Sequence, residues 1–301
     1  MKKRILEYDF EVYLSCIKKS YATSIQSELP VVSDFPNSLF ESNSKINLEE
    51  LETYGEKSPN AFIKSICNRI LGVYNIQYSR RHGSELDIKS TWEYIANSIL
   101  QISLESTISS IGSQGFLSVP LFKYDVEIES FEFLRFHIWS PQIEALVDQE
   151  KRELFSIHSH SFHAQSWIIT GSLINADFDI VQNSNDSNSS LFKVEYNKSL
   201  NEVNQHQSKA INTNINVKSI QTSVRNLNQG DTYTIQEGEF HKSIQKESSQ
   251  LSATFFSFNA KDRNVVQSHV LGPIDIKESS INRKMFIDPS SFISDVNKSL
   301  K

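Results

Sequence analysis

The chain has 301 residues, of which 38% are hydrophobic and 22% are charged, so it can bury one large core or two modest ones. Its formal net charge of −6 at pH 7 argues against nucleic-acid binding, which normally needs a basic face. The 19 Phe and 10 Tyr, against only 2 Met, favour a core built largely from β-sheet.

The N-terminal residues and the cysteines indicate a cytoplasmic protein. Glu7, Asp9 and Glu11 interrupt the apolar run that a secretory signal peptide needs. No apolar run approaches the roughly 18 residues of a membrane span. Cys16 and Cys67 lie far apart in apolar helical contexts, so we expect two buried free thiols. These features predict a protein of the reducing cytoplasm that contacts neither a membrane nor nucleic acid.

The first part of the chain has the apolar spacing of helices. Apolar side chains recur at helical intervals in Arg4–Ile25, Ala61–Tyr78 and Leu86–Ile111. Gly112 and Gly115 then end the last of these segments. We therefore predict a helical N-terminal region over residues 1–116.

From about Leu117 the apolar period shortens to that of strands, which predicts a mainly β sandwich or barrel over residues 117–275 and a C-terminal extension over 276–301. The predicted strands are Phe131–Trp139, Leu154–His160, Gln165–Thr170, Ser172–Val181, Leu191–Tyr196, Thr232–Ile235, Phe240–Gln245, Ser252–Phe258 and Asn264–Val270. Residues 182–229 are rich in Asn, Ser and Gln, which indicates a solvated excursion, a lid over the barrel being the alternative. Within this segment, polar and apolar residues alternate over Ile211–Ile220, and this alternation is compatible with one further strand.

Histidines mark the candidate site. His158 and His160 are two residues apart on a predicted strand, so their side chains share one face about 7 Å apart. A metal that binds both needs a further ligand from elsewhere in the fold. His241 is the best candidate, because a strand and a glycine turn at Gly238 precede it.

These segments resemble the two motifs of the cupin family. His158, His160, Gln165 and Gly171 fall at or within one residue of the first motif's spacing, and Gly230, Gly238 and His241 match that of the second. The resemblance implies a jelly-roll β-barrel with His158, His160 and His241 as metal ligands. Gln165 replaces the family's usual carboxylate ligand, a departure similar to the three-histidine, cysteine-dioxygenase-like cupins, which also carry an N-terminal helical portion.

A neutral three-histidine set leaves the charge of a divalent ion uncompensated, so it favours an anionic substrate. Facial nitrogen ligation with open positions suits Fe(II), which can bind substrate and O₂ together, while Zn²⁺, Ni²⁺ and Mn²⁺ also fit this ligand type.

Further residues are candidates for contacts with the substrate. Arg135 and His137 share one face of the predicted strand Phe131–Trp139, which is either a solvated outer face or the wall of a polar cavity. In the second case Arg135 would hold a substrate carboxylate, with Lys123 as a rival. Tyr233 is a candidate for orienting O₂ or the substrate, and a core or rim position is its alternative. His163 is a candidate proton donor or substitute metal ligand, with a position at the rim or beside the ligands as the alternative, and Gln165 and Trp167 are candidates for cavity contacts.

The leading hypothesis is a metal-dependent cupin dioxygenase that acts on a small anionic metabolite, for which the resemblance implies an amino acid or a thiol. The alternatives are a metal-free cupin that binds a ligand or a partner, and a metal-dependent isomerase or lyase. Pairing of cupins through edge strands further implies a homodimer.

Overall fold

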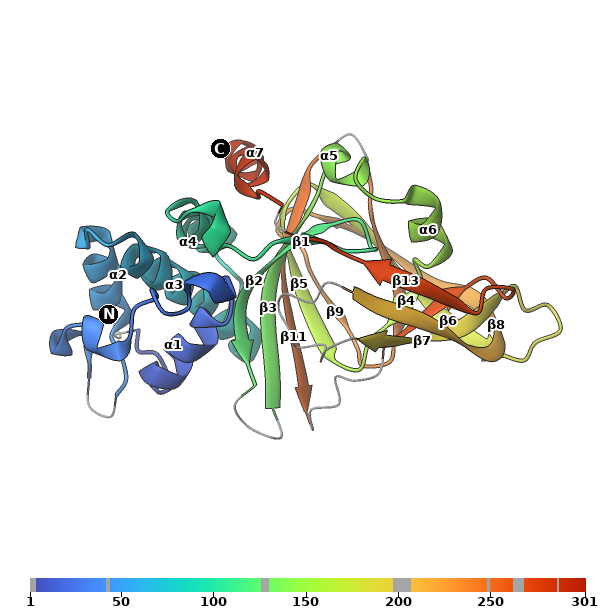
Figure 1. The fold of residues 1–301 in the computed structure, drawn as a ribbon, viewed down its shortest axis with the longest axis horizontal. Helices are drawn as coiled ribbons and strands as arrows, with labels where there is room; N and C mark the ends of the chain where they lie inside the picture. Colours follow the sequence, from blue (N-terminus) through green and yellow to red (C-terminus); the bar gives the residue numbers. More distant parts are fainter. Residues whose placement is uncertain are drawn as a thin grey trace.

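The computed structural model describes residues 4–41, 44–125, 130–196, 207–247, 250–261, 268–285 and 287–301. It is mainly β, with a helical N-terminal region beside two large antiparallel sheets (Figure 1), which confirms the predicted fold class at this level. The helices are α1 (Phe10–Lys18), α2 (Leu48–Lys57), α3 (Ala61–His82), α4 (Ile88–Leu100), α5 (Pro141–Glu144), α6 (Gln149–Leu154) and α7 (Ser290–Ser299).

Local signals explain where the N-terminal helices begin and end. The side chains of Asp9, Asn47, Asn60 and Asp87 accept hydrogen bonds from the first backbone N–H groups of α1 to α4. Helix α3 ends at Gly83, which adopts a left-handed conformation with φ 61°. The predicted segment Leu86–Ile111 is shorter as a helix, because α4 ends at Leu100 and the chain turns toward the first sheet.

Among the described residues each sheet contains seven strands, and all of their pairings are antiparallel. The first sheet runs β14 (Lys284–Met285), β1 (Ser110–Ile111), β2 (Leu117–Tyr124), β3 (Ser130–Trp139), β11 (Ser252–Lys261), β5 (His163–Thr170), β9 (Thr232–Ile235). The second sheet runs β13 (Glu278–Asn282), β8 (Gln207–Asn228), β6 (Ser172–Gln182), β10 (Phe240–Gln245), β4 (His158–Ser159), β12 (Ser268–Gly272), β7 (Ser189–Tyr196), and β8 also pairs with β7.

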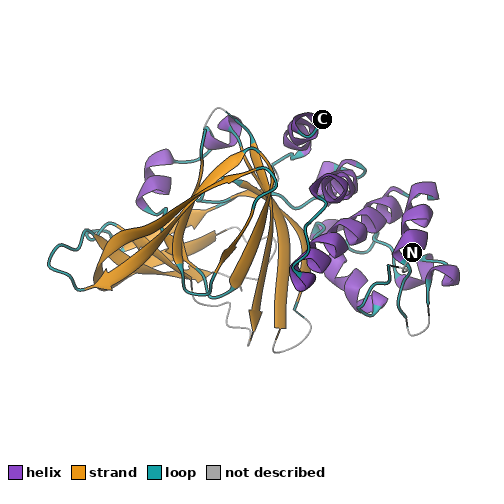
Figure 2. Cartoon of the chain, turned by 180° about the vertical axis from the view of Figure 1, so that it is seen from behind, coloured by secondary structure: helices purple, strands orange, loops and turns teal. Residues whose placement is uncertain are grey.

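The helical region covers one face of the first sheet (Figure 2). Leu134, Phe136 and Ile138 of β3 belong to one continuous apolar core with residues of α1, α3 and α4. A polar contact also crosses this boundary, because buried Glu132 accepts a hydrogen bond from Gln77 and pairs with Arg80 at 2.9 Å. Both faces of the first sheet are therefore buried, one against the helices and the other inside the β structure.

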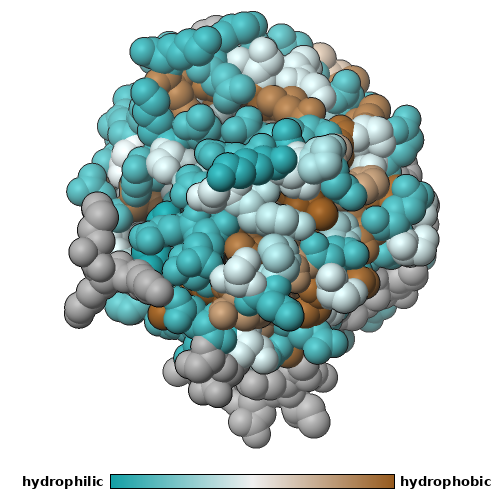
Figure 3. Space-filling view, turned by 90° about the vertical axis from the view of Figure 1, so that its left-hand side faces the viewer, coloured by the Kyte–Doolittle hydropathy of each residue, from teal (hydrophilic) through white to brown (hydrophobic). Residues whose placement is uncertain are grey.

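The face of the molecule at the helical end is mostly hydrophilic, and hydrophobic atoms form only scattered patches there (Figure 3). This agrees with the burial of the apolar sides of α1 and α4 in the shared core. No helix among the described residues is long and apolar enough to cross a membrane.

The polar segment 182–229 was predicted as a solvated excursion, with one further strand over Ile211–Ile220 left open. That strand is present and is longer than its alternation indicated, so the excursion is wrong for residues 207–228. Strand β8 extends over 22 residues, Gln207–Asn228, and pairs with β6, β7 and β13. Many side chains of β8 are exposed, so hydrogen bonds to neighbouring strands hold it rather than apolar burial. Its polar composition therefore reflects solvent on one face of a strand.

Two other predicted strands differ in the structure. Most of Leu154–His160 is not a strand, because α6 ends at Leu154 and β4 contains only His158–Ser159. For the predicted strand Asn264–Val270, residues up to 267 lie outside the described part, and β12 begins at Ser268. The C-terminal extension is integrated into the fold, since β13 joins the second sheet, β14 joins the first, and Trp92 of α4 donates to Asn297 of α7 at 2.7 Å.

Candidate functional site

A cavity of about 250 Å³ lies between the two sheets. Strands β3, β9 and β11 of the first sheet contribute to its walls, as do β4, β8, β10, β12 and β13 of the second. Its lining includes His158, His160 and His241, so the three predicted metal ligands share one cavity.

The three imidazole rings lie close together. The ring centroids of His158 and His241 are 4.3 Å apart, those of His160 and His241 are 5.0 Å apart, and those of His158 and His160 are 6.3 Å apart. Backbone pairing explains this, because His241 of β10 stands directly opposite His158 of β4. The structure thus brings together residues from two segments that are far apart in the sequence.

Each ring is oriented by a main-chain carbonyl two residues away. Nδ1 of His158 lies 3.1 Å from the carbonyl oxygen of Ser156, and Nδ1 of His160 lies 2.9 Å from that of Phe162. Nδ1 of His241 lies 3.3 Å from the carbonyl oxygen of Glu239. A carbonyl only accepts, so Nδ1 must carry the proton in each contact, and Nε2 of the neutral ring keeps its lone pair.

Burial keeps these rings neutral. It lowers the pKa of His160 to about 3, holds that of His241 well below its usual value and also lowers that of His158. The neighbouring imidazoles add to the effect at His160 and His241. Nε2 of His160 is buried and has no hydrogen-bond partner within the described residues. A buried lone pair without a donor is costly, so this atom needs a proton donor or a metal ion.

The donor chemistry fits a divalent ion. Three neutral imidazoles bound through Nε2 at about 2.1 Å would place their ring centroids roughly 4.5–5.5 Å apart. The His158–His241 and His160–His241 separations of 4.3 and 5.0 Å are close to this range, and the His158–His160 separation of 6.3 Å exceeds it. With the side chains in these positions, no three His, Cys, Asp or Glu residues of the described chain are arranged so that they could hold a metal ion together. Ligation by all three therefore requires His158 and His160 to turn toward each other.

Strand β3 presents a second set of predicted residues to the cavity. Arg135 and His137 line it, together with Trp139. The Arg135 guanidinium lies 4.1 Å from the centre of the Phe133 ring, and its Nη1 lies 3.3 Å from Ser118 Oγ. His137 is buried, and burial together with the charge of Arg135 holds its pKa well below the usual value. This face of β3 is therefore a wall of the cavity and not a solvated outer face.

Tyr233 of β9 also lines the cavity, and burial raises its pKa. Its phenol therefore stays protonated at neutral pH and can donate a hydrogen bond.

Gln165, Trp167 and His163 lie on the other face of the first sheet, so the prediction that they face the barrel interior is wrong. Trp167 packs in the core shared with the helices, whereas Ala164 and Ile168 face the β interior. Ser257, the cross-strand partner of Gln165, accepts a hydrogen bond from Arg80 of α3. Residues two apart share a face, so His163 follows Gln165.

Lys123 is also misplaced as a cavity residue. It is absent from the described lining of the cavity, and its Nζ pairs with Asp125 at 3.1 Å. Arg135 is therefore the better of the two predicted anion-binding residues.

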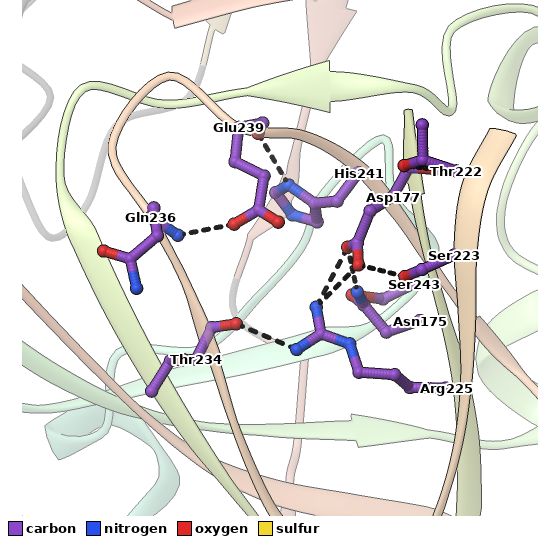
Figure 4. Close-up of polar contacts among 10 residues, drawn as sticks. All are labelled: Asn175, Asp177, Thr222, Ser223, Arg225, Thr234, Gln236, Glu239, His241 and Ser243. Atoms are coloured by element: carbon purple, nitrogen blue, oxygen red, sulfur yellow. Dashed lines mark hydrogen bonds and ion pairs between the residues drawn. The ribbon is translucent and has the colours of Figure 1, made fainter. Parts of the chain in front are cut away.

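A polar layer behind His241 was missed (Figure 4). Arg225 of β8 pairs with Asp177 of β6 at 2.9 Å, and Asn175 Nδ2 donates to the same carboxylate at 2.8 Å. Ser243 Oγ donates to Asn175 Oδ1 at 2.8 Å, and Ser243 lines the cavity. The sequence did contain a signal for part of this layer, because Asn175 and Asp177 alternate on the same face of the predicted strand as Leu173. Arg225 lies in a segment whose polar composition is typical of a loop, so it gave no such signal.

Three further residues that line the cavity were also not predicted. Lys151, His269 and Arg283 line it, and they come from α6, β12 and the turn between β13 and β14. His269 is partly buried in the structure. None of the three belongs to the histidine and glycine spacing that marks the site, so that spacing gave no signal for them.

No family model matches the chain, and no curated protein matches it either, so the likeness to cupins is carried by the histidine and glycine spacing alone.

Proposed function

We propose that His158, His160 and His241 hold a divalent metal ion, with Fe(II) the best match, in a cupin-type barrel that oxidises a small anionic metabolite with O₂. The observation that supports this proposal best is the arrangement of the rings. Three imidazoles share one cavity, each is tied through Nδ1 to a main-chain carbonyl, and each offers Nε2 as a neutral ligand.

An Fe(II) ion in such a site would supply open positions in which substrate and O₂ meet. The protein's own residues would bind and orient the substrate. Arg135 has the planar fork that suits a carboxylate, and it lies on the cavity wall formed by β3. The protonated Tyr233 phenol can donate a hydrogen bond to an oxygen of the substrate. The aromatic side chains of the walls exclude water from the reacting atoms.

A location in the reducing cytoplasm would suit this chemistry. Both cysteines are free and buried, and a reducing compartment maintains iron in its ferrous state.

A second candidate is a metal-free module that binds an anionic ligand in the same cavity. The 6.3 Å separation of the His158 and His160 rings and the absence of a ready metal group among the described residues favour it. In this function Nε2 of His160 would accept a hydrogen bond from the ligand instead of binding a metal.

Metal analysis of untagged protein decides between the two. We expect about one equivalent of metal in the wild-type protein and tight rebinding of Fe(II) or Co(II) after chelation. His160→Ala should abolish rebinding, whereas His163→Ala should bind as the wild type does, because His163 follows the opposite face of β5.

Oxygen consumption by the metal-loaded protein tests the second half of the proposal. Wild-type protein that binds no metal even at micromolar excess would rule out the metal-dependent dioxygenase and leave the binding module. Turnover of a substrate without oxygen uptake would instead support an isomerase or lyase that uses the same ligands.

A further inference from the structure

The histidine end of the cavity is linked to Arg135 by a chain of aromatic contacts. The His160 ring stacks on Phe162 at 4.0 Å, and Phe162 stacks on Phe258 at 4.3 Å. Phe258 contacts Phe133 at 5.0 Å, and the Arg135 guanidinium lies over Phe133. Three phenylalanine rings therefore connect His160 to Arg135 along the wall of the cavity.

Beyond Arg135 the same wall carries a stack of aromatic rings. The His137 ring lies between Phe116 at 4.2 Å and Phe256 at 5.1 Å, tilted by only 30° and 32° from their planes. Phe116 in turn contacts Trp139 at 5.1 Å. All of these side chains line the cavity, so this part of the wall presents aromatic edges that suit contact with an aromatic ring.

Trp139 lies next to this stack on the same wall. Its side chain is 5% exposed, and the buried Nε1 has no hydrogen-bond partner within the described residues. An indole N–H can only donate, so it needs an acceptor that the described protein does not provide. Arg135 and Trp139 share a face of β3 four residues apart, about 13 Å along the strand.

The charge of the cavity favours an anion. Arg135, Lys151 and Arg283 line it, and its described lining contains no Asp or Glu. Its volume also limits the ligand. A cavity of 150 Å³ binds benzene, so one of about 250 Å³ takes roughly ten to twelve non-hydrogen atoms. This exceeds a small thiol amino acid and suits a single aromatic ring with short substituents.

We propose that the ligand of this cavity is an aryl carboxylate whose ring carries a hydrogen-bond acceptor on the side opposite the carboxylate. Arg135 binds the carboxylate, the stacked rings of Phe116, His137 and Phe256 contact the ring, and Trp139 Nε1–H donates to the distal acceptor. The inference rests on the proposed function only in taking this cavity as the substrate site.

Two probes that differ by one oxygen test it: 3-(4-hydroxyphenyl)propionate and 3-phenylpropionate. Titration calorimetry on chelator-treated wild-type protein should show at least a 5-fold preference for the hydroxylated acid, because only that acid satisfies Trp139. Trp139→Phe should remove the preference. Trp167→Phe, which removes an indole from the opposite face of the first sheet, should retain it. Arg135→Gln should lower the affinity for both acids about 10-fold or more.

Equal affinity for the two acids in the wild-type protein would overturn the proposal, and so would a preference that survives in Trp139→Phe. If Trp139→Phe does not fold, the indole N–H resonance of Trp139 in ¹⁵N-labelled wild-type protein replaces it, assigned by comparison with Trp92→Phe and Trp167→Phe. This resonance should move on addition of the hydroxylated acid and not of its parent, and an unmoved resonance would contradict the proposal.

The two proposals fail separately. Binding of the aryl acid by protein that takes up no metal would leave this inference standing and remove the metal centre. Metal uptake by protein that binds neither acid, with or without Fe(II), would do the reverse.

Discussion

His158 and His241 stand directly opposite each other in neighbouring antiparallel strands, and their ring centroids are 4.3 Å apart. This pairing is the only register contact between β4 and β10 among the described residues, so one backbone pair positions two of the three candidate ligands. His160 lies just beyond β4, and its own Nδ1 contact with the Phe162 carbonyl orients its ring.

The first prediction concerns the tautomers of these rings. His158, His160 and His241 should all be protonated at Nδ1 in metal-free protein, because each Nδ1 faces a carbonyl oxygen. Long-range ¹H–¹⁵N correlation spectra of histidine-labelled protein measure this directly. Addition of Zn²⁺ should then shift the three Nε2 resonances and leave that of His82 on α3 unchanged. An Nε2-protonated ring at any of the three positions would contradict the assignment.

The second prediction is a pH dependence of stability caused by His137. Burial and the charge of Arg135 hold the pKa of His137 well below 6.5 in the folded protein, whereas the unfolded chain takes up a proton near that value. The unfolded state then binds more protons below pH 6.5, so stability falls as the pH falls and is unaffected above that range. Each pH unit below that value lowers the free energy of unfolding by up to about 1.4 kcal/mol.

Urea denaturation of the wild type and of His137→Phe between pH 7 and pH 5 measures this contribution. The difference between their unfolding free energies should change by about 2 kcal/mol in favour of the variant as the pH falls. Parallel pH profiles would mean that His137 is not held neutral in the folded protein.

The sequence was informative where the chemistry repeats at a fixed spacing. The distance between His158 and His160 along the chain, and the glycines before His241, predicted which histidines would meet, although β4 is much shorter than the predicted strand. The face of β5 could not be predicted in the same way. Because the helical region buries the outer face of the first sheet, both sides of β5 carry buried residues, and alternation does not identify the cavity side.

Strand β8 shows a second limit. Its Asn- and Ser-rich sequence has the composition of a loop, and pairing with β6 over residues 172–182 determines its conformation instead. Tertiary pairing of this kind overrides local propensity, so Arg225 could not be placed beside Asp177 from the sequence.

The third prediction concerns this Asp177–Arg225 pair. The Asp177 carboxylate accepts hydrogen bonds from Asn175, Ser223 and Arg225, and its side chain is 13% exposed. Asp177→Ala should cost about 2–3 kcal/mol, because it leaves three donors without their acceptor. A double-mutant cycle with Arg225→Ala should give a coupling of about 1–2 kcal/mol, reduced by the partial exposure of the arginine.

The Lys209–Glu278 pair provides the matched control, since both side chains are more than half exposed. The same cycle on this pair should give a much smaller coupling that vanishes in high salt. If the two cycles give equal couplings, the polar layer behind His241 contributes no more than a surface ion pair.

The last prediction concerns Arg69 of α3, which is fully buried in the helical region. Its guanidinium contacts Ser20 Oγ at 2.8 Å and Ser98 Oγ at 3.2 Å, and it lies 4.0 Å from the centre of the Tyr21 ring. Ser20 and Ser98 lie at the C-terminal ends of α1 and α4, where helix dipoles favour a cation.

The dipoles at these two helix ends only partly offset the loss of solvation, since Nη2 of Arg69 has no partner among the described residues. Arg69→Met, which keeps the volume and removes the charge, should therefore change the unfolding free energy by less than about 1.5 kcal/mol. Arg69→Ala should cost about 3 kcal/mol, because it leaves a cavity. Urea denaturation of both variants separates packing from charge. Equal losses in the two would show that the cation, rather than the volume of the side chain, stabilises the contact between α1, α3 and α4.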